Sequence, residues 1–276
     1  MDKTVAVRGV FDALSSREVR FFQEASGLGR VHLFLEDDDT VRTLYKRDPE
    51  FSLVERKYFW EAVRFIDAVT IVSSDCSIDE LPLTCVSKPG VWCLEEDQDS
   101  KGKRAFCREK GIGCTVIQED ALKGFPVVPV EITRNPEGSG KKMVIVTGCY
   151  DYFHSGHVRF FEEVSQFGNL YVVVGSDANV RLLKGEGHPM YSEEERRYMA
   201  GSIKYVTQAF VSTGKGWLDA EPEIRKIKPD IYAVNEEGDK PEKRNFCEET
   251  GIEYVVLKRA PKEGLPRRTS TNLRGF

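Results

Sequence analysis

The sequence predicts an α/β protein whose two domains each contain a parallel sheet with helices on both faces. The chain has 276 residues, of which 40% are hydrophobic and 31% charged, and this is enough for two globular domains. Short apolar segments rich in β-branched residues alternate with segments that have apolar residues at helical spacing. The second half of the chain also repeats the first half, so one domain pattern is expected twice.

The internal repeat is visible at a nearly constant offset. The motif VRFF at residues 19–22 recurs at residues 158–161, which is 139 residues later. After one inserted residue, KRAFCREKGI at residues 103–112 recurs as KRNFCEETGI at residues 243–252. Agreement over so many positions indicates a tandem duplication of one domain.

The repeat also indicates where the domains divide. We expect a first domain over residues 1–132, a linker over residues 133–142 and a second domain over residues 143–276. The linker sequence TRNPEGSGKK is rich in Pro, Gly, Ser and charge, a composition that is typical of segments between domains.

The expected elements alternate in both copies. In the second copy they are a strand at 143–148, a helix from 157, a strand at 170–175, a helix from 192, a strand at 208–212, a further helix, a strand at 230–235, a helix at 240–251 and a strand at 253–258. The strands are apolar on both faces, which favours a parallel sheet covered by helices on each side. Ser192 with Glu195 predicts a helix start, and Gly251 predicts a helix end.

Charge and composition argue against several classes of protein. The formal net charge is −5, which disfavours broad attraction to nucleic acid. No apolar run approaches the roughly 18 residues that a membrane span needs, and the N-terminal sequence does not resemble a signal peptide. The seven cysteines are scattered without a C-x-x-C pair, so we expect reduced thiols and a cytoplasmic protein.

The stretch VTGCYDYFHSGHVRFFEEV, residues 146–164, carries the first candidate site. His154 and His157 flank Gly156 where an apolar strand gives way to a helix. Ligands of open α/β sheets bind at the carboxyl ends of strands, and a helix start attracts anions. The two imidazoles therefore predict a phosphate site that stabilises a phosphoryl-type transition state. Zinc ligation and ordinary surface histidines are the alternatives for this pair.

Four segments of the second copy together resemble a known family. They are GCYDYFHSGH (148–157), SDANVRLLKGEGHP (176–189), SEEERRYMAGSIKYV (192–206) and RRTSTNL (267–273). In this order they resemble the nucleotidyltransferase superfamily of cytidylyltransferases and their adenylyl-transferring relatives, over about residues 142–274. The resemblance implies two Rossmann-like, doubly wound domains that form an internal pseudo-dimer, so that the chain could work as a monomer.

The resemblance also implies a reaction and its residues. An acceptor phosphate attacks the α-phosphate of a nucleoside triphosphate and expels pyrophosphate, and Mg²⁺ is bound mainly through the triphosphate. The implied catalytic residues are His154, His157, Lys184 and Arg196. The implied nucleotide-binding residues are Thr147, Gly148, Cys149, Tyr150, Asp151, Gly156, Asn235, Arg268, Thr269, Ser270 and Thr271. The repeat favours Arg196 over Arg197 because Arg56 stands at the matching position of the first copy. Asp151 has the matching Asp12, so a purely structural role is its alternative.

The sequence leaves three alternative functions for the second copy. The Arg-Thr of the closing segment favours transfer from CTP to a small phosphomonoester, an alcohol or sugar phosphate. The sequence LKGEGHP resembles sugar-phosphate adenylyltransferases and favours ATP instead. A non-catalytic nucleotide sensor or scaffold is the third reading. Lys215 and Trp217 either line an acceptor pocket or form a surface turn.

The first copy lacks the same chemistry. Ser15, Arg17 and Glu18 replace His154, Gly156 and His157, and VVPVE follows Phe125-Pro126 where the second copy has RRTST. Glu18 would repel phosphate. We therefore expect a catalytically inactive domain that supports the active one, although a spacer or a regulatory ligand site is an alternative.

Overall fold

The computed structural model describes residues 3–73, 77–83, 88–127, 131–132 and 140–273. The chain forms two compact units, residues 1–124 and residues 125–276. Phe125 lies in the second unit, where its ring packs against Tyr198 with the ring centroids 5.0 Å apart. The predicted linker falls mostly on residues outside the described ranges, so its role stays a prediction.

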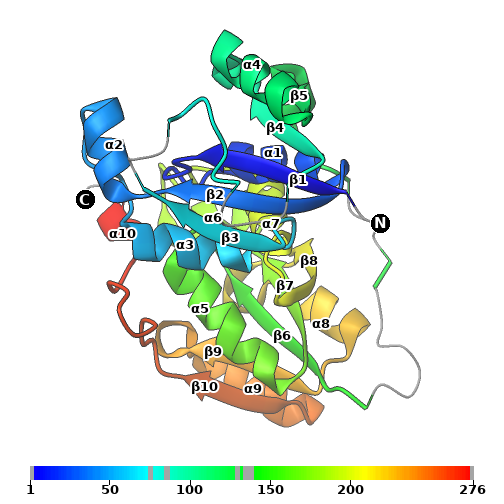
Figure 1. Ribbon diagram of the computed structural model, residues 1–276. Coiled ribbons are helices and arrows are strands. Elements are labelled where there is room, and N and C mark those ends of the chain that lie inside the picture. Colours follow the sequence, from blue (N-terminus) through cyan, green and yellow to red (C-terminus); the bar gives the residue numbers. More distant parts are fainter. Residues whose placement is uncertain (1–2, 74–76, 84–87, 128–130, 133–139, 274–276) are drawn as a thin grey trace. The chain divides into compact units, whose positions relative to one another are not determined.

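Each unit contains one five-stranded parallel sheet, as predicted (Figure 1). The strands of the first unit are β1 (Thr4–Gly9), β2 (Arg30–Glu36), β3 (Ala68–Val72), β4 (Val91–Glu95) and β5 (Gly113–Ile117). The strands of the second unit are β6 (Met143–Gly148), β7 (Asn169–Val174), β8 (Val206–Val211), β9 (Ile231–Asn235) and β10 (Glu253–Leu257).

Most helices lie between the strands as predicted, with two differences. Each unit has an additional helix after its second strand, and the described residues of the first unit form no helix between its third and fourth strands. In the first unit they are α1 (Ser16–Ser26), α2 (Asp38–Tyr45), α3 (Leu53–Ala62) and α4 (Lys101–Lys110), with short 3-10 helices η1 (Glu96–Gln98) and η2 (Glu119–Leu122). In the second unit they are α5 (Ser155–Val164), α6 (Asp177–Lys184), α7 (Glu193–Gly201), α8 (Glu221–Ile227), α9 (Pro241–Thr250) and α10 (Ser270–Leu273), with η3 (Ser165–Phe167), η4 (Gly216–Leu218) and η5 (Glu236–Gly238). Ser192 caps α7 by accepting the Glu195 amide, and Gly251 ends α9 with a left-handed conformation, both as predicted.

The two sheets have the same strand order. The first sheet runs β3-β2-β1-β4-β5 and the second runs β8-β7-β6-β9-β10, so the first strand of each unit is central. The chain adds two strands on one side of β6 and then crosses to the other side with β9. The gap between β6 and β9 is therefore the topological switch point, where open α/β sheets bind their ligands. The two units thus share one strand order, and the duplication itself stays a prediction from the sequence repeat.

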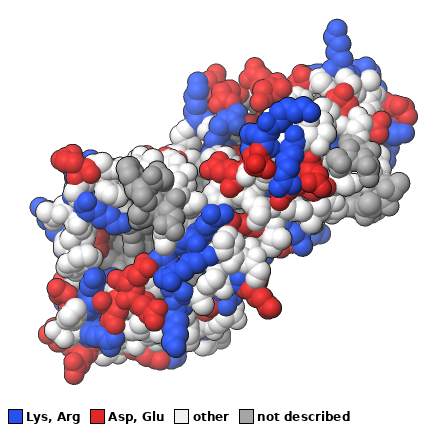
Figure 2. All heavy atoms as spheres, turned by 90° about the vertical axis from the view of Figure 1, so that its left-hand side faces the viewer, with Lys and Arg blue, Asp and Glu red and all other residues white. Residues whose placement is uncertain are grey.

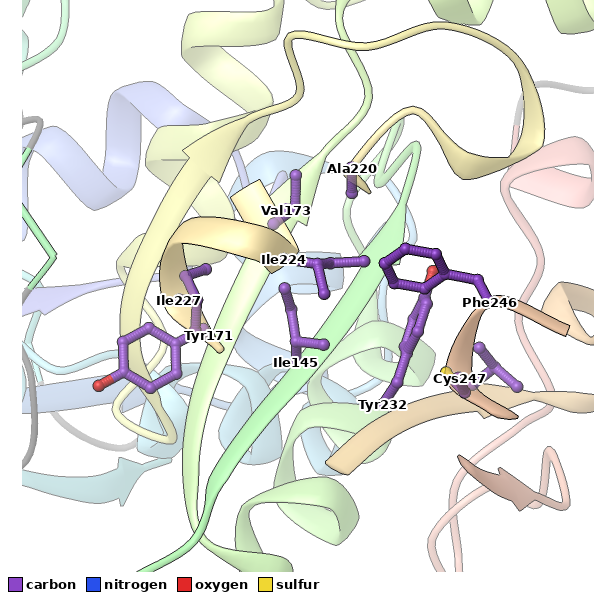
Figure 3. Close-up of a cluster of buried hydrophobic side chains, with 10 residues drawn as sticks. Ile145, Tyr171, Val173, Ala220, Ile224, Ile227, Tyr232, Phe246 and Cys247 are labelled. Carbon is purple, nitrogen blue, oxygen red and sulfur yellow. The ribbon is translucent and has the colours of Figure 1, made fainter. Parts of the chain in front are cut away.

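The core of the second unit supports this switch point from one face of the sheet. Ile145 and Val173 point from β6 and β7 toward α8, while Tyr232 of β9 lies beside Phe246 of α9. Figure 3 shows Ile224 of α8 between these side chains. The packed cluster fixes the ends of β6 and β9 relative to α9.

The surface carries both signs of charge. On the face in Figure 2, Lys and Arg are interspersed with Asp and Glu, as the small net charge of −5 predicts. Over the described part of the chain, no helix combines the length and apolar character required to cross a membrane.

Candidate active site

The second unit has a cavity of about 540 Å³ at its switch point. The walls come from the ends of β6, β7, β9 and β10 and from the starts of the segments that follow them. The residues predicted for the site that line this cavity are Thr147, Gly148, Cys149, Tyr150, Asp151, Gly156, His157, Lys184, Asn235, Thr269 and Ser270. The structure thus brings segments that are more than 100 residues apart in the sequence into one cavity.

His154 is the N-cap residue of α5. Its Nδ1 accepts a hydrogen bond from the Gly156 amide at 3.0 Å, so the neutral ring carries its proton on Nε2. Burial, with help from Arg259 and Arg268, lowers the pKa of His154 to about 3. The His154 ring is fully buried, and its Nε2 has no partner among the described residues. His154 therefore acts as a neutral imidazole behind the cavity wall.

His157 lies directly against His154 and faces the cavity. The ring centroids are 4.0 Å apart and the rings are inclined by 24°, a stacked pair. Burial, followed by the charges of His154, Arg259 and Lys184, holds the pKa of His157 well below its usual range. Both imidazoles are neutral at physiological pH. They provide N–H donors, not the positive charge that a protonated pair would bring.

Gly148 and Gly156, at the bend between β6 and α5, leave space for the aromatic rings of Tyr150 and His154. A Cβ on Gly156 would come within 2.9 Å of the His154 ring and 3.5 Å of the Arg268 carbonyl oxygen. A Cβ on Gly148 would come within 2.9 Å of the Tyr150 ring, and Tyr150 itself has a φ of 52°. Any side chain at either glycine would displace an aromatic ring of the site.

The closing segment reaches the histidine segment. The Ser270 hydroxyl donates to the Asp151 carbonyl oxygen at 2.7 Å, and Thr269 and Ser270 share the cavity with His157. Arg268 was predicted in the same cradle, but it lines a smaller neighbouring pocket of about 20 Å³. The Thr271 side chain lies outside what the structure describes.

Lys184 supplies a positive charge to the cavity that His157 lines. It is the last residue of α6, it is exposed, and it lines the cavity. Its charge is among those that lower the pKa of His157. Lys184 thus shares the cavity with His157, and its catalytic role stays a prediction.

Arg196 was predicted to contact substrate, and the structure places it elsewhere. The side chain is 1% exposed and is absent from the described cavity lining. Its guanidinium donates to the carbonyl oxygens of Tyr191, Cys149 and Gly175 and to the Asp177 carboxylate. A guanidinium with its donors occupied in this way ties the ends of β6 and β7 to the start of α7. We therefore assign Arg196 a positioning role and not a substrate contact.

Asp151 and Asn235 also hold backbone in place. The Asp151 carboxylate accepts from the amides of Met190 and Tyr191, and the Asn235 carboxamide oxygen accepts from the Gly238 amide. Both side chains line the cavity, while their oxygens accept hydrogen bonds from the backbone amides of these turns. Asp151 thereby fits the structural alternative that its match with Asp12 suggested.

Sequence reasoning missed several cations of the cavity. Lys240, Lys243, Lys258 and Arg259 all line it. Arg259 also donates to the Arg268 carbonyl oxygen at 2.7 Å and so links the segment after β10 to the closing segment. Lys258 and Arg259 directly follow β10, so the rule that ligands bind at the carboxyl ends of strands could have indicated them.

The cavity offers few free carboxylates for a metal ion. Among the acids that line it, Glu163 pairs with Arg159, Glu237 pairs with Arg259, and Asp219 accepts from Ser212. In the described ranges, no group of three His, Cys, Asp or Glu side chains is placed to hold a metal. A Mg²⁺ ion at this site would need phosphate oxygens as its main ligands.

The fold and the cavity define an α/β domain with a cavity lined by histidine, lysine and hydroxyl side chains at its switch point. Residues 145–263 match the family model "Cytidylyltransferase-like". Residues 145–263 of the second unit thus resemble a cytidylyltransferase-like domain.

Curated relatives match part of the chain. "Bifunctional protein HldE" of a Nitratiruptor species is 32% identical over 115 residues, which are 41% of this chain and 24% of the relative. The protein of the same name from Aliarcobacter butzleri is 37% identical over 93 residues, 33% of this chain and 19% of the relative. The chain thus spans about a quarter or less of the length of these relatives. A solved lipopolysaccharide core biosynthesis protein from Thermoplasma volcanium is 24% identical, with a TM-score of 0.38 over 45% of this chain and 100% of its own.

Proposed function

We propose that the second unit transfers a nucleotidyl group from a nucleoside triphosphate to a small phosphomonoester and releases pyrophosphate. One observation carries this proposal: a single cavity joins His157, Lys184 and the Thr269–Ser270 segment. An anion that fills this cavity meets neutral N–H donors on one side, an ammonium on another and hydroxyls on a third. This set of groups suits a polyphosphate chain.

The proposed chemistry is an in-line displacement at the α-phosphate. An oxygen of the acceptor phosphate forms a bond to the α-phosphorus while the bond to the pyrophosphate oxygen breaks and its electrons leave with pyrophosphate. Neutral His157 donates a hydrogen bond to the α-phosphate, and Lys184 offsets the charge that grows on it. His154 keeps the His157 ring in place by stacking, since its own Nδ1 is already engaged with Gly156.

We assign the β- and γ-phosphates of the triphosphate to the closing segment, residues 267–273. The Thr269 hydroxyl donates to the β- and γ-phosphates and Arg259 contributes charge beside it, while the Ser270 hydroxyl holds the segment to the Asp151 carbonyl oxygen. Mg²⁺, when bound, would neutralise phosphate charge and be held by the phosphate oxygens themselves. Residues such as Arg196 and Asp151 keep the surrounding turns in position without contacting the reacting atoms.

CTP is the first donor to test, because the closing Arg-Thr resembles that of cytidylyltransferases. ATP is the second candidate, because residues 183–189 resemble sugar-phosphate adenylyltransferases. The full chain is incubated with CTP, ATP, GTP or UTP, together with a panel of phosphorylated alcohols and sugars, while pyrophosphate is measured. We expect pyrophosphate release only with one triphosphate and one class of acceptor.

The controls separate catalysis from sensing. Omitting the acceptor reports the background hydrolysis of the triphosphate, and the His157→Ala chain reports release that does not depend on the site. Triphosphate binding without pyrophosphate release across the whole panel would favour the non-catalytic sensor.

A further inference from the structure

The segment that joins β10 to α10, residues 258–269, forms part of the cavity wall. Lys258, Arg259 and Thr269 of this connecting segment all line the cavity. The segment contains no helix and no strand, so the hydrogen bonds of a sheet or helix do not fix its course. Its side-chain contacts therefore decide where these three cavity residues lie.

Both ends of the connecting segment are fastened at the cavity. Near its start, Arg259 pairs with Glu237 and donates to the Arg268 carbonyl oxygen at 2.7 Å. Directly after its end, the Ser270 hydroxyl donates to the Asp151 carbonyl oxygen at 2.7 Å. The middle of the segment has a different partner, the helix α5.

An ion pair joins the middle of the connecting segment to α5. The Lys262 Nζ lies 3.0 Å from Glu162 Oε1, and the two side chains are 43% and 19% exposed. The Glu162 carboxylate also accepts from the Arg159 guanidinium at 3.0 Å and from the Tyr205 hydroxyl at 3.4 Å. Glu162 is therefore an anion held in place by its own neighbours, on the same helix that carries His157.

The first unit holds its matching segment by other means. Gln23 and Leu122 stand at the positions of Glu162 and Lys262. Leu122 is 6% exposed, and the neighbouring Ala121 carbonyl oxygen accepts from an arginine of α1 at 2.8 Å. The unit without the histidines thus buries an apolar side chain at this place, whereas the unit with the histidines uses two charges that water can reach.

We propose that the Lys262–Glu162 pair is a latch that holds the connecting segment against α5 and so keeps Arg259 and Thr269 beside the phosphates of a bound triphosphate. This assignment rests on the proposed function of the cavity. Neither member of the pair belongs to the described lining of the cavity, so both are positioning residues and not substrate contacts. A partly exposed ion pair can break without unfolding of the domain.

The sign of one affinity change separates a latch from a simple charge effect. Removal of an anion near the cavity should strengthen triphosphate binding if only its charge mattered. Glu162→Gln releases the connecting segment and should instead weaken the binding of CTP or ATP, whichever the wild type binds, about three- to fivefold, the scale for one partly exposed ion pair. Lys262→Met should give a similar loss, and the double variant should lose no more than either single variant, because all three remove the same contact. Calorimetric titration of the full chain measures these affinities.

Hydrogen exchange followed by mass spectrometry reports on the connecting segment without any nucleotide. Both single variants should speed exchange in peptides that cover residues 258–269, while peptides of the first unit stay unchanged. Glu163→Gln is the matched control, because it removes the adjacent carboxylate, which pairs with Arg159 at 2.6 Å, and leaves the latch intact. It should neither weaken triphosphate binding nor speed this exchange. Lys262→Arg keeps the charge and should retain both properties of the wild type.

The outcomes distinguish the latch from the proposed function. Stronger or unchanged triphosphate binding by Glu162→Gln would overturn the latch, as would additive losses in the double variant, an equal loss in Glu163→Gln or unchanged exchange of the connecting segment. No binding of either triphosphate by the wild type would overturn the proposed function, whereas faster exchange in the two single variants would still establish that the latch holds the segment.

Discussion

The two units contain the same buried arginine in the same hydrogen-bond network. Arg56 of the first unit donates to the carbonyl oxygens of Phe51, Val10 and Glu36 and to the Asp38 carboxylate. Arg196 makes the corresponding bonds at each matching position of the second unit. The network persists in a unit without the histidines, so it serves the fold and not the chemistry.

The units differ at the positions that face the cavity. Thr147 and Gly175 of the second unit correspond to Arg8 and Glu36 of the first. Arg8 and Glu36 form a buried ion pair at 3.2 Å, and Arg8 also donates to the carbonyl oxygens of Ser77 and Glu80. Tyr45 takes the position of Lys184.

In the first unit, the Arg8–Glu36 pair stands at the strand ends whose counterparts line the proposed nucleotide site of the second. The first unit keeps its strands, its sheet order and its buried arginine, and fills the end of its central strands with large, mutually paired side chains. Opening or closing this space therefore depends on a few side chains at the strand ends.

Transferring the ion pair to the second unit should produce the largest effect. The double variant Thr147→Arg with Gly175→Glu places a paired arginine and glutamate at the switch point. We expect triphosphate binding and pyrophosphate release to fall to background, because the side chains occupy the cavity. Circular dichroism and calorimetry check folding and binding, and full binding by a folded variant would contradict the comparison.

Removing the His157 ring should reduce turnover without closing the cavity. We expect His157→Ala to lower kcat by about 100-fold or more, the scale for the loss of one transition-state donor, with triphosphate affinity largely kept. The matched change in the first unit, Glu18→Ala, should leave kcat unchanged. Equal effects of the two variants in a pyrophosphate assay would argue against the distinction between the units.

The buried arginines should behave alike when they are removed. Arg56→Met and Arg196→Met each leave a carboxylate and several carbonyl oxygens without their donor, so we expect each to lower the free energy of unfolding of its own unit by about 3 kcal/mol. Urea denaturation followed by tryptophan fluorescence measures this, since Trp60 and Trp92 report the first unit and Trp217 the second. Lower kcat with unchanged stability in Arg196→Met would restore its catalytic assignment.

The smallest effects that we expect are changes of stability with pH, and these changes have opposite signs in the two units. Burial raises the pKa of Glu18 to about 7, so the folded first unit holds more protons than the unfolded chain between about pH 4.5 and 7. Its stability should fall as pH rises through this range. Burial lowers the pKa of His154 to about 3, so the second unit should gain stability as pH rises from about 3 to 6.5.

Two variants test how the stability of each unit depends on pH. Glu18→Gln should remove the fall in the first unit. His154→Asn, which still offers a helix cap, should reduce the rise in the second, where the lowered pKa of His157 continues to contribute. Denaturation at pH 5, 6 and 7 with the tryptophan reporters measures both slopes. Parallel slopes in the two units would contradict the assigned ionisation states.

The sequence predicted the elements well because their signals are local. The apolar strands, the caps at Ser192 and Gly251 and the histidine bend are each readable within about ten residues. The true partners of Arg196 could not be predicted, since its carbonyl acceptors at Cys149 and Gly175 become neighbours only after the sheet forms. The neutrality of the histidines likewise depends on burial, which no motif reveals.

A crystal structure of the full chain with a non-hydrolysable triphosphate analogue tests the central claim most directly. The account predicts the α-phosphate beside His157 and Lys184, with the terminal phosphates at Thr269 and Ser270 and no nucleotide at the Arg8–Glu36 pair. A triphosphate bound in the first unit, or bound away from His157, would contradict it.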